Sequence, residues 1–248
     1  MSQNTKNVNS KLTEISKALL NFAGENQMKI KMKNLENIVA EKLLEIKAIK
    51  VQPSNPFTWA SGWKSPIYCD NRKTLSYPGL RTFIKIELSR LIWEKYGQVD
   101  VIAGVATGAI AQGAMIADEL GLPFVYIRSS PKGHGLENLI EGDLKPGQKV
   151  VVIEDLISTG GSSLKAVEAI RKDGCEVLGM MAIFTYGFPV ATEQFEEAGV
   201  ELTTLSNYEA VLEHLLRTNF IGEDEMKVLQ EWRKDPANWE PGGRKTKK

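Results

Sequence analysis

The sequence has few cysteines, no net charge and no long apolar run, and each of these absences excludes a class of protein. Two cysteines in 248 residues are too few for a disulfide framework. The 31 Lys and Arg residues balance the 31 Asp and Glu residues, so the chain lacks the basic surplus typical of proteins that bind nucleic acid. No apolar run approaches the roughly 20 residues of a membrane helix, and the polar start MSQNTKNVNS lacks the apolar core of a signal peptide. We therefore expect a cytoplasmic protein without nucleic-acid or membrane partners.

The composition and the order of predicted elements favour a single α/β domain. A chain of 248 residues with 42% hydrophobic content can bury one substantial core. Strand and helix patterns alternate through most of the chain, as in α/β folds whose strands are joined by right-handed crossovers. The predicted strands are residues 99–105, 124–127, 150–153 and 177–184, and the predicted helices are residues 35–49, 80–96, 109–120, 165–172 and 208–216. We expect a central, mostly parallel sheet flanked by helices.

The most informative segment is VVIEDLISTGGSS, residues 151–163. Its β-branched apolar run predicts a strand buried on both faces, and ligands of parallel sheets bind at the carboxyl ends of such strands. The adjacent carboxylates of Glu154 and Asp155 suit ribose hydroxyls or a hydrated divalent cation. A turn of hydroxyls and glycines then opens a helix, an arrangement that favours phosphate. The turn consists of Ser158, Thr159, Gly160, Gly161 and Ser162. The segment predicts a site for a sugar phosphate.

Two other phosphate signatures do not fit the sequence. Gly142 and Gly147 have the spacing of a P-loop, but Gln148 stands where the lysine is required, and the run precedes a strand. Residues 133–138 fail the dinucleotide-binding pattern at its last glycine. For a bare Ser/Thr/Gly turn, an ordinary loop that caps a helix is the simpler interpretation. The preceding acid pair favours the sugar-phosphate site instead.

A long connection between residues 128 and 148 predicts a lid. It lacks any periodicity and is rich in Gly, Pro and Lys, and loops of that length commonly carry function. Taken singly, Arg128, Lys132 and His134 would be interpreted as solvated surface groups. Together in a loop with glycine hinges, beside a predicted phosphate site, they favour anion binding.

Three segments of the chain resemble, in order, the motifs of the orotate phosphoribosyltransferases, which are type I phosphoribosyltransferases. Residues 154–162 resemble the motif that binds 5-phosphoribosyl 1-diphosphate (PRPP). FTWASGWKSPIYCDNRKTLSYP, residues 57–78, resembles the orotate-site segment, and YIRSSPKGHG, residues 126–135, resembles the loop that closes over the site. The resemblance covers about residues 35–232. It implies the type I phosphoribosyltransferase fold with an N-terminal hood over the base site.

The resemblance also implies roles for individual residues. PRPP would contact Arg128, Lys132, His134, Glu154, Asp155, Leu156, Ile157, Ser158, Thr159, Gly160, Gly161 and Ser162. Lys132, His134 and Asp155 would be catalytic. Orotate would contact Ser158, Tyr68 and Lys64, with Tyr68 stacked on the ring and with Lys64 and the backbone of residues 65–71 near the carboxylate. No direct metal ligand is implied, because Mg²⁺ would be held mainly through PRPP, with any contact to Asp155 made through water.

The implied reaction transfers the 5-phosphoribosyl group from PRPP to orotate and gives orotidine 5′-monophosphate and pyrophosphate, a step of pyrimidine (UMP) biosynthesis. The implied cofactor is Mg²⁺, and the implied assembly is a cytoplasmic homodimer in which the lid of one subunit reaches the site of the other. Two alternatives stay open. One is a phosphoribosyltransferase for a purine base, and the other is a regulator that senses PRPP without catalysis.

The sequence departs from much-studied family members at several anion-binding positions. Ala60, Thr107 and Ser129 stand where those members carry lysine, and an arginine expected near Thr185 or Tyr186 is absent. These departures predict a divergent branch of the family, whose anion contacts rest more on the lid cations and on backbone amides.

The ends of the chain extend beyond the resemblance. We expect residues 1–31 to be an extension, with Met28 or Met32 as alternative starts, and residues 241–248 to be a basic tail. Residues 32–240 would form one domain, with a hood at about 32–80, a core at about 81–205 and C-terminal helices at about 206–235. His214, in the last of the predicted helices, is assigned a structural role.

Overall fold

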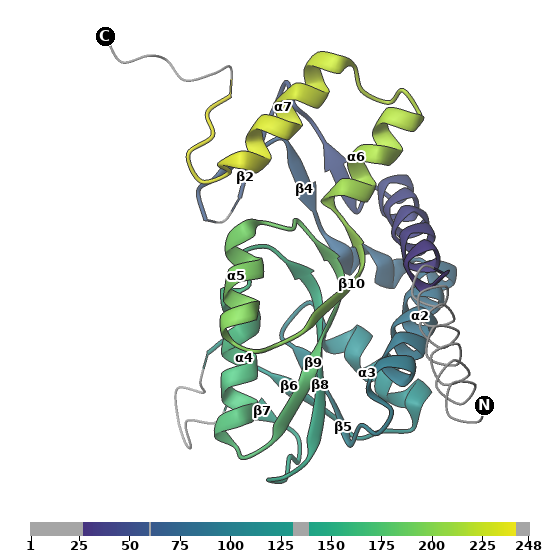
Figure 1. Cartoon of the computed structure of the whole chain (residues 1–248), viewed down its shortest axis with the longest axis vertical. Helices are drawn as coiled ribbons and strands as arrows, with labels where there is room; N and C mark the ends of the chain where they lie inside the picture. Colours follow the sequence, from purple (N-terminus) through teal and green to yellow (C-terminus); the bar gives the residue numbers. More distant parts are fainter. Residues whose placement is uncertain (1–26, 60, 131–138, 242–248) are drawn as a thin grey trace, which may run out of the picture.

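A six-stranded sheet lies at the centre of the molecule (Figure 1). The structure is a computed structural model, and it describes residues 27–59, 61–130 and 139–241. The strands, in spatial order, are β10 (Leu202–Asn207), β9 (Glu176–Thr185), β8 (Lys149–Ile157), β5 (Val101–Val105), β6 (Phe124–Ile127) and β7 (Ile140–Glu141). All neighbours are parallel except β6 and β7, which are antiparallel. The predicted mostly parallel sheet is confirmed.

Strand β8 is central because its residues can be buried on both faces. Val150, Val151, Val152 and Ile153 have no exposed surface. Val151 and Ile153 pack into the core on one face of the sheet, whereas Val150 and Val152 pack into the core on the other. The predicted end of this strand at residue 153 is wrong, because pairing with β9 continues as far as Ile157. The acid pair therefore lies within the strand and takes its rigidity from the sheet.

Helices cover both faces of the sheet. Helices α2 (Pro78–Tyr96) and α3 (Ile110–Leu120) contribute to one core, and α4 (Gly161–Lys172) and α5 (Pro189–Glu197) contribute to the other. The predicted stop signals are confirmed, since α2 and α3 end at Gly97 and Gly121 with φ of 63° and 66°. In that region glycine has no steric penalty. Within the described ranges, no helix has the length and apolarity needed to cross a bilayer.

The structure differs from the sequence in the bounds of the first predicted helix and in the connection after residue 128. The predicted helix at residues 35–49 is already helical at residue 27 and ends at residue 45, and Ile49 instead begins strand β1 (Ile49–Val51). The helix ends because Lys47 adopts φ of 56° and the Ala48 N–H donates to the Leu43 carbonyl at 2.9 Å. The connection after residue 128, which has no periodicity in the sequence, contains the two-residue strand β7.

The hood is made of short strands and a 3-10 helix, and its labelled strands β2 (Phe57–Thr58) and β4 (Ile67–Cys69) lie toward one end of the molecule (Figure 1). Strand β1 pairs with β4, and β2 pairs with β3 (Lys64–Ser65). The 3-10 helix η1 (Asn71–Ser76) follows β4 and leads into α2. A hydrogen bond from the Asn71 side chain to the Asp155 carbonyl holds η1 beside β8, so the hood is joined to the central sheet at this point.

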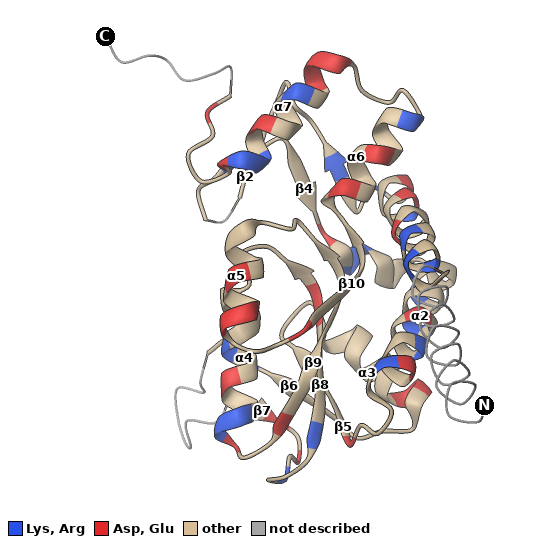
Figure 2. Cartoon of the chain, in the orientation of Figure 1, with Lys and Arg blue, Asp and Glu red and all other residues tan. Residues whose placement is uncertain are grey.

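The C-terminal helices hold the hood against the sheet. Helix α6 (Tyr208–Arg217) follows β10, and α7 (Glu223–Lys234) lies beside the hood in Figure 1. Trp232 of α7 is fully buried and its indole N–H donates to the Lys64 carbonyl at 3.1 Å. Its ring lies 5.7 Å from that of Trp59 and 5.9 Å from that of Tyr186, just after β9. Figure 2 shows charges of both signs interspersed along α4 and α7, on the outside of these layers.

Candidate active site

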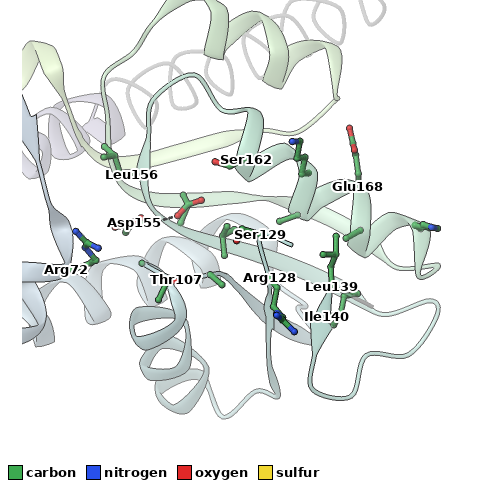
Figure 3. Close-up of a pocket in the computed structure, with 18 of the residues that line it drawn as sticks. Arg72, Thr107, Arg128, Ser129, Leu139, Ile140, Asp155, Leu156, Ser162 and Glu168 are labelled. Carbon is green, nitrogen blue, oxygen red and sulfur yellow. Dashed lines mark hydrogen bonds between the residues drawn. The ribbon is translucent and has the colours of Figure 1, made fainter. Parts of the chain in front are cut away.

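A basin of about 1170 Å³ opens where β5, β6 and β8 end (Figure 3). Hood, loop, strand and helix residues line it. Its lining includes Cys69, Asp70 and Arg72, residues 105–108 after β5, Arg128 and Ser129 after β6, Glu154, Asp155 and Leu156 of β8, and Ser162 with further residues along α4. Asp155 lies in this basin near the carboxyl end of β8, where parallel sheets bind their ligands.

Glu154 is the buried member of the acid pair. It is 6% exposed, and its carboxylate accepts hydrogen bonds from the Asp155 N–H and the Ser163 hydroxyl, each at 2.9 Å. Burial, reinforced by the neighbouring charge of Asp155, raises the pKa of Glu154 well above its usual value. Ser163 lies in the first turn of α4, so Glu154 joins that helix to β8.

Asp155 presents its carboxylate to the basin above the loop after β5. Gly108 lies so close that a methyl group added at its Cα would collide with the Asp155 carboxylate. On the hood side, the Asn71 amide donates to the Asp155 carbonyl at 2.6 Å. The peptide between Ala106 and Thr107, in the same loop as Gly108, is cis. The position of Asp155 is therefore set by contacts from two directions.

The turn after β8 ends at the N-terminus of α4. Gly160 precedes the helix with φ of 88°, and Ser162 in the first turn is exposed to the basin. A side chain at Gly160 would also meet the Phe195 ring, whose nearest carbon lies 2.9 Å from the position of a Cβ. Glycine is thus required here for two reasons, and it lets the chain enter α4 beside the basin.

The structure brings together some of the predicted site residues and leaves others apart. Arg128, Glu154, Asp155, Leu156 and Ser162 line the basin, and so do Thr107 and Ser129. The lining residues of β8 are connected to those of α4 by five further predicted contacts, which are Ile157, Ser158, Thr159, Gly160 and Gly161. Lys132 and His134, and also Ala60, lie outside the described residues.

The two predicted orotate contacts in the hood, Tyr68 and Lys64, are not among the described lining residues, although Tyr68 precedes Cys69, which lines the basin. The Tyr68 ring is 5.6 Å from the Phe57 ring, and the Lys64 amino group donates to the Thr58 hydroxyl at 2.7 Å. Near Tyr186, where an arginine was expected, the Arg233 guanidinium of α7 donates to the Gly187 carbonyl at 2.9 Å. The partly buried imidazole of His214 lies 3.7 Å from the exposed Glu41 carboxylate, and His214 is not among the basin-lining residues. The orotate contacts of Tyr68 and Lys64 stay predictions.

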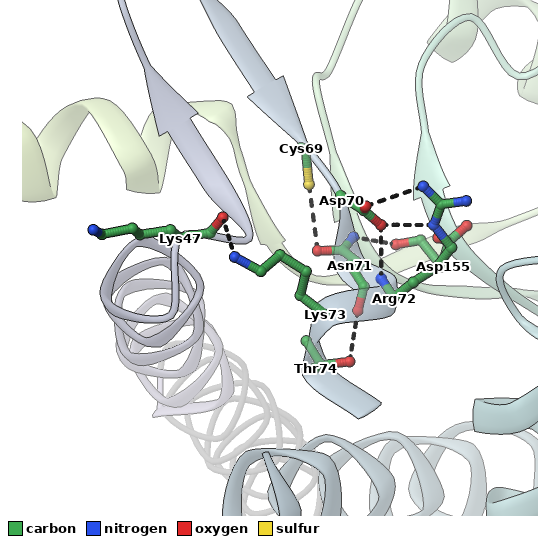
Figure 4. Close-up of polar contacts among 8 residues, drawn as sticks. All are labelled: Lys47, Cys69, Asp70, Asn71, Arg72, Lys73, Thr74 and Asp155. Atoms are coloured by element: carbon green, nitrogen blue, oxygen red, sulfur yellow. Dashed lines mark hydrogen bonds and ion pairs between the residues drawn. The ribbon is translucent and has the colours of Figure 1, made fainter. Parts of the chain in front are cut away.

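Sequence reasoning missed the side chains of Asp70, Asn71 and Arg72 (Figure 4). Asp70 accepts from the Arg72 Nε at 2.7 Å and from its Nη2 at 3.0 Å, and both residues line the basin. Asn71 accepts from the Cys69 thiol at 3.3 Å while donating to β8. The available signal was the Asp-x-Arg spacing just after a predicted base-binding segment, but such a spacing is also common in exposed ion pairs.

Comparisons with known proteins agree with this geometry. Residues 82–201 match the phosphoribosyl transferase domain family. The orotate phosphoribosyltransferase of Phocaeicola vulgatus is 74% identical over 211 residues, which cover 85% of this chain and 100% of that protein. That of Bacteroides fragilis is 72% identical with the same coverage. The crystal structure of orotate phosphoribosyltransferase from Aeropyrum pernix superposes with a TM-score of 0.62 at 29% identity, covering 74% of this chain and 99% of the other.

Proposed function

The chain belongs to the orotate phosphoribosyltransferase family, and we infer that its basin transfers the 5-phosphoribosyl group of PRPP to orotate in UMP biosynthesis. The bond between C1 and the pyrophosphate oxygen breaks, a bond between C1 and N1 of orotate forms, and orotidine 5′-monophosphate and pyrophosphate leave. The observation that carries this proposal is the Asp155 carboxylate, held over the loop after β5 and beside the first turn of α4. The named relatives favour orotate over a purine base and an enzyme over a regulator.

The two acids of the pair lie in different environments, which suit different roles. Asp155 faces the basin and is placed to accept hydrogen bonds from the ribose hydroxyls of PRPP. Its charge also opposes the positive charge that develops on the sugar ring in an oxocarbenium-like transition state. Glu154 also lines the basin, as expected of a PRPP contact, and its hydrogen bond with Ser163 holds the start of α4 against β8.

The turn and the start of α4 suit the 5′-phosphate. Backbone N–H groups at a helix N-terminus attract anions, and the hydroxyls of Ser158, Thr159 and Ser162 add donors. Ser162 lines the basin, so a phosphate bound here would lie within reach of the ribose on Asp155. This arrangement supports the assignment of residues 158–162 to PRPP binding.

Arg128 supports a site for the leaving pyrophosphate at the other side of the basin. It lines the basin, and its Nη1 lies 3.4 Å from the Glu141 carboxylate of β7. The family resemblance implies that Lys132 and His134 also contact the pyrophosphate. Together with Arg128 they would compensate the negative charge that builds on the leaving group. Closing such a lid would also exclude the water that hydrolyses PRPP.

Mg²⁺ dependence is part of the proposal. Among the described residues there is no cluster of three side chains able to hold a metal ion, and of the two carboxylates that line the basin Asp155 is the less buried. That donor set fits Mg²⁺, which commonly binds through substrate phosphates with few protein carboxylates. When bound, the ion would neutralise phosphate charge and orient the pyrophosphate group of PRPP. Asp155 would contact it through water.

The family resemblance further supports a cytoplasmic homodimer with shared lids. A mixture of a Lys132→Ala variant with an Asp155→Asn variant tests the sharing. Heterodimers that combine one intact lid with one intact acid pair should regain activity. If mixing restores no activity although heterodimers form, each subunit works with its own lid.

The choice of base is tested by the loss of orotate absorbance on mixing purified protein with PRPP and Mg²⁺, with adenine, guanine and hypoxanthine in parallel reactions. We expect consumption of orotate that requires both PRPP and Mg²⁺, and no consumption of the purines. Tight PRPP binding with no base consumed would instead identify a regulator.

A further inference from the structure

Arg72 is a basin cation to which the proposed function gives no role. It lies in η1, directly after the hood strand β4, and its side chain is 60% exposed. Of the other cations in the described lining, Arg128 lies beyond β6, and Lys165 and Lys172 lie along α4. Arg72 is therefore the described lining cation that comes from the hood.

Asp70 holds the Arg72 guanidinium in one orientation. The Asp70 carboxylate accepts from the Arg72 backbone N–H at 3.2 Å, from Nε at 2.7 Å and from Nη2 at 3.0 Å. Asp70 is its hydrogen-bond partner in the part of the chain that the structure describes, so both Nη1 hydrogens and the second Nη2 hydrogen stay available. A guanidinium that is already positioned loses little conformational entropy when it binds a planar anion with its free edge.

The segment that carries Arg72 is tied to the acid pair. The neighbouring Asn71 donates to the Asp155 carbonyl at 2.6 Å, so the distance between η1 and β8 is fixed by a short hydrogen bond. In Figure 3, the Asp155 side chain lies between Arg72 on one side and Arg128 on the other. Two cations from different elements thus flank the carboxylate that we assign to the ribose.

This placement matches the geometry of the proposed displacement, on which the inference rests. In an in-line displacement, the nucleophile and the leaving group lie on opposite sides of C1. With the ribose on Asp155 and pyrophosphate toward Arg128, the base approaches from the side of Arg72. The orotate carboxylate is attached to the carbon next to the reacting N1, so a group that binds it must lie near the reaction centre. We propose that Arg72 binds this carboxylate and selects orotate over pyrimidines that lack it.

Lys64 is the other candidate for the same carboxylate, since the resemblance assigns it there. Its amino group donates to Thr58 on the neighbouring strand, and Lys64 is not part of the described basin lining. Arg72 lines the basin and offers a planar pair of free donors that matches a carboxylate, whereas Lys64 offers a point charge outside the described lining.

The first test measures steady-state kinetics of Arg72→Ala and Arg72→Lys with orotate and PRPP varied separately. Loss of a charge-assisted contact should lower kcat/KM for orotate about 10- to 150-fold in Arg72→Ala. Arg72→Lys should fall less, because it keeps the charge and loses the fork. The matched control is Arg217→Ala, whose side chain is 63% exposed and pairs with Glu41 away from the basin. The control should retain wild-type kinetics, and an unchanged kcat/KM for orotate in Arg72→Ala would overturn the proposal.

The second test separates carboxylate binding from a general effect on the site. Calorimetry compares the binding of orotidine 5′-monophosphate with that of uridine 5′-monophosphate, which differs only by lacking the carboxylate. Arg72→Ala should weaken the first about 10- to 150-fold and leave the second within about threefold. Equal weakening of both would overturn the proposal. A wild-type protein that neither consumes orotate nor binds its nucleotide would refute the proposed function itself, which the variants alone cannot do.

Discussion

Replacing Gly108 by alanine should separate the position of Asp155 from the stability of the fold. The added methyl group would occupy the space of the Asp155 carboxylate, whose carbon and both oxygens are the nearest atoms. Asp155 must then move by on the order of 1 Å, and a displacement of that size can lower a catalytic rate by about 100-fold. Since the obstructing group is the end of a half-buried side chain, it can rotate away, and we expect unfolding free energy to fall by no more than about 1–3 kcal/mol.

The assay is the initial rate of orotate consumption, with urea unfolding measured on the same preparations. Gly79→Ala is the matched control, because a Cβ there meets no atom within 4 Å and the residue lies in the exposed first turn of α2. It should keep full activity. A Gly108→Ala enzyme that folds and works within threefold of the wild-type rate would refute the claim that the position of Asp155 against this loop matters for catalysis.

Two further predictions concern the pH dependence of stability and the anchoring of the hood. Burial raises the pKa of Glu154 in the folded state. Its contribution to the free energy of unfolding is therefore full below the unfolded-state pKa and is lost as pH rises through the folded-state pKa. Glu154→Gln should make the free energy of unfolding, measured by urea titration, fall less between about pH 4 and 8. An identical pH dependence in both proteins would contradict the assignment of the raised pKa to Glu154. Trp232→Ala removes a fully buried ring and its bond to the hood, and should cost about 3–5 kcal/mol of unfolding free energy. Trp93→Ala, at a side chain that is 71% exposed, should cost less than about 0.5 kcal/mol, and equal losses would show that the Trp232 cluster does not anchor the hood.

Much of the core could be predicted because local sequence determines it. The continuous β-branched run at residues 150–153 is typical of a strand buried on both faces of a sheet, as is observed. Gly97 and Gly121 end helices at positions where the backbone has a positive φ. The acid pair followed by a hydroxyl-rich turn likewise located the basin.

The parts that sequence reasoning missed depend on contacts between distant segments. The end of β8 is set by its pairing with β9, which extends the strand through two carboxylates that a propensity argument would place in a loop. The role of Gly108 depends on how the loop after β5 packs against Asp155, and that of Arg72 depends on how the hood meets the basin. Neither contact can be inferred from the neighbouring residues in the sequence. The cluster around Trp232 similarly joins the hood, the end of β9 and α7.

The assignment of Asp155 to the reacting ribose is tested most directly by comparing orotate consumption by the wild-type protein and by Asp155→Asn, with saturating PRPP and Mg²⁺. Asparagine keeps the size of the side chain and its contact with Gly108, but removes the charge placed against the ribose. We expect PRPP-dependent consumption by the wild type and a fall of about 100-fold or more in the variant. Wild-type protein that consumes no orotate, or a variant that matches its rate, would contradict the assignment of this basin as the site of phosphoribosyl transfer.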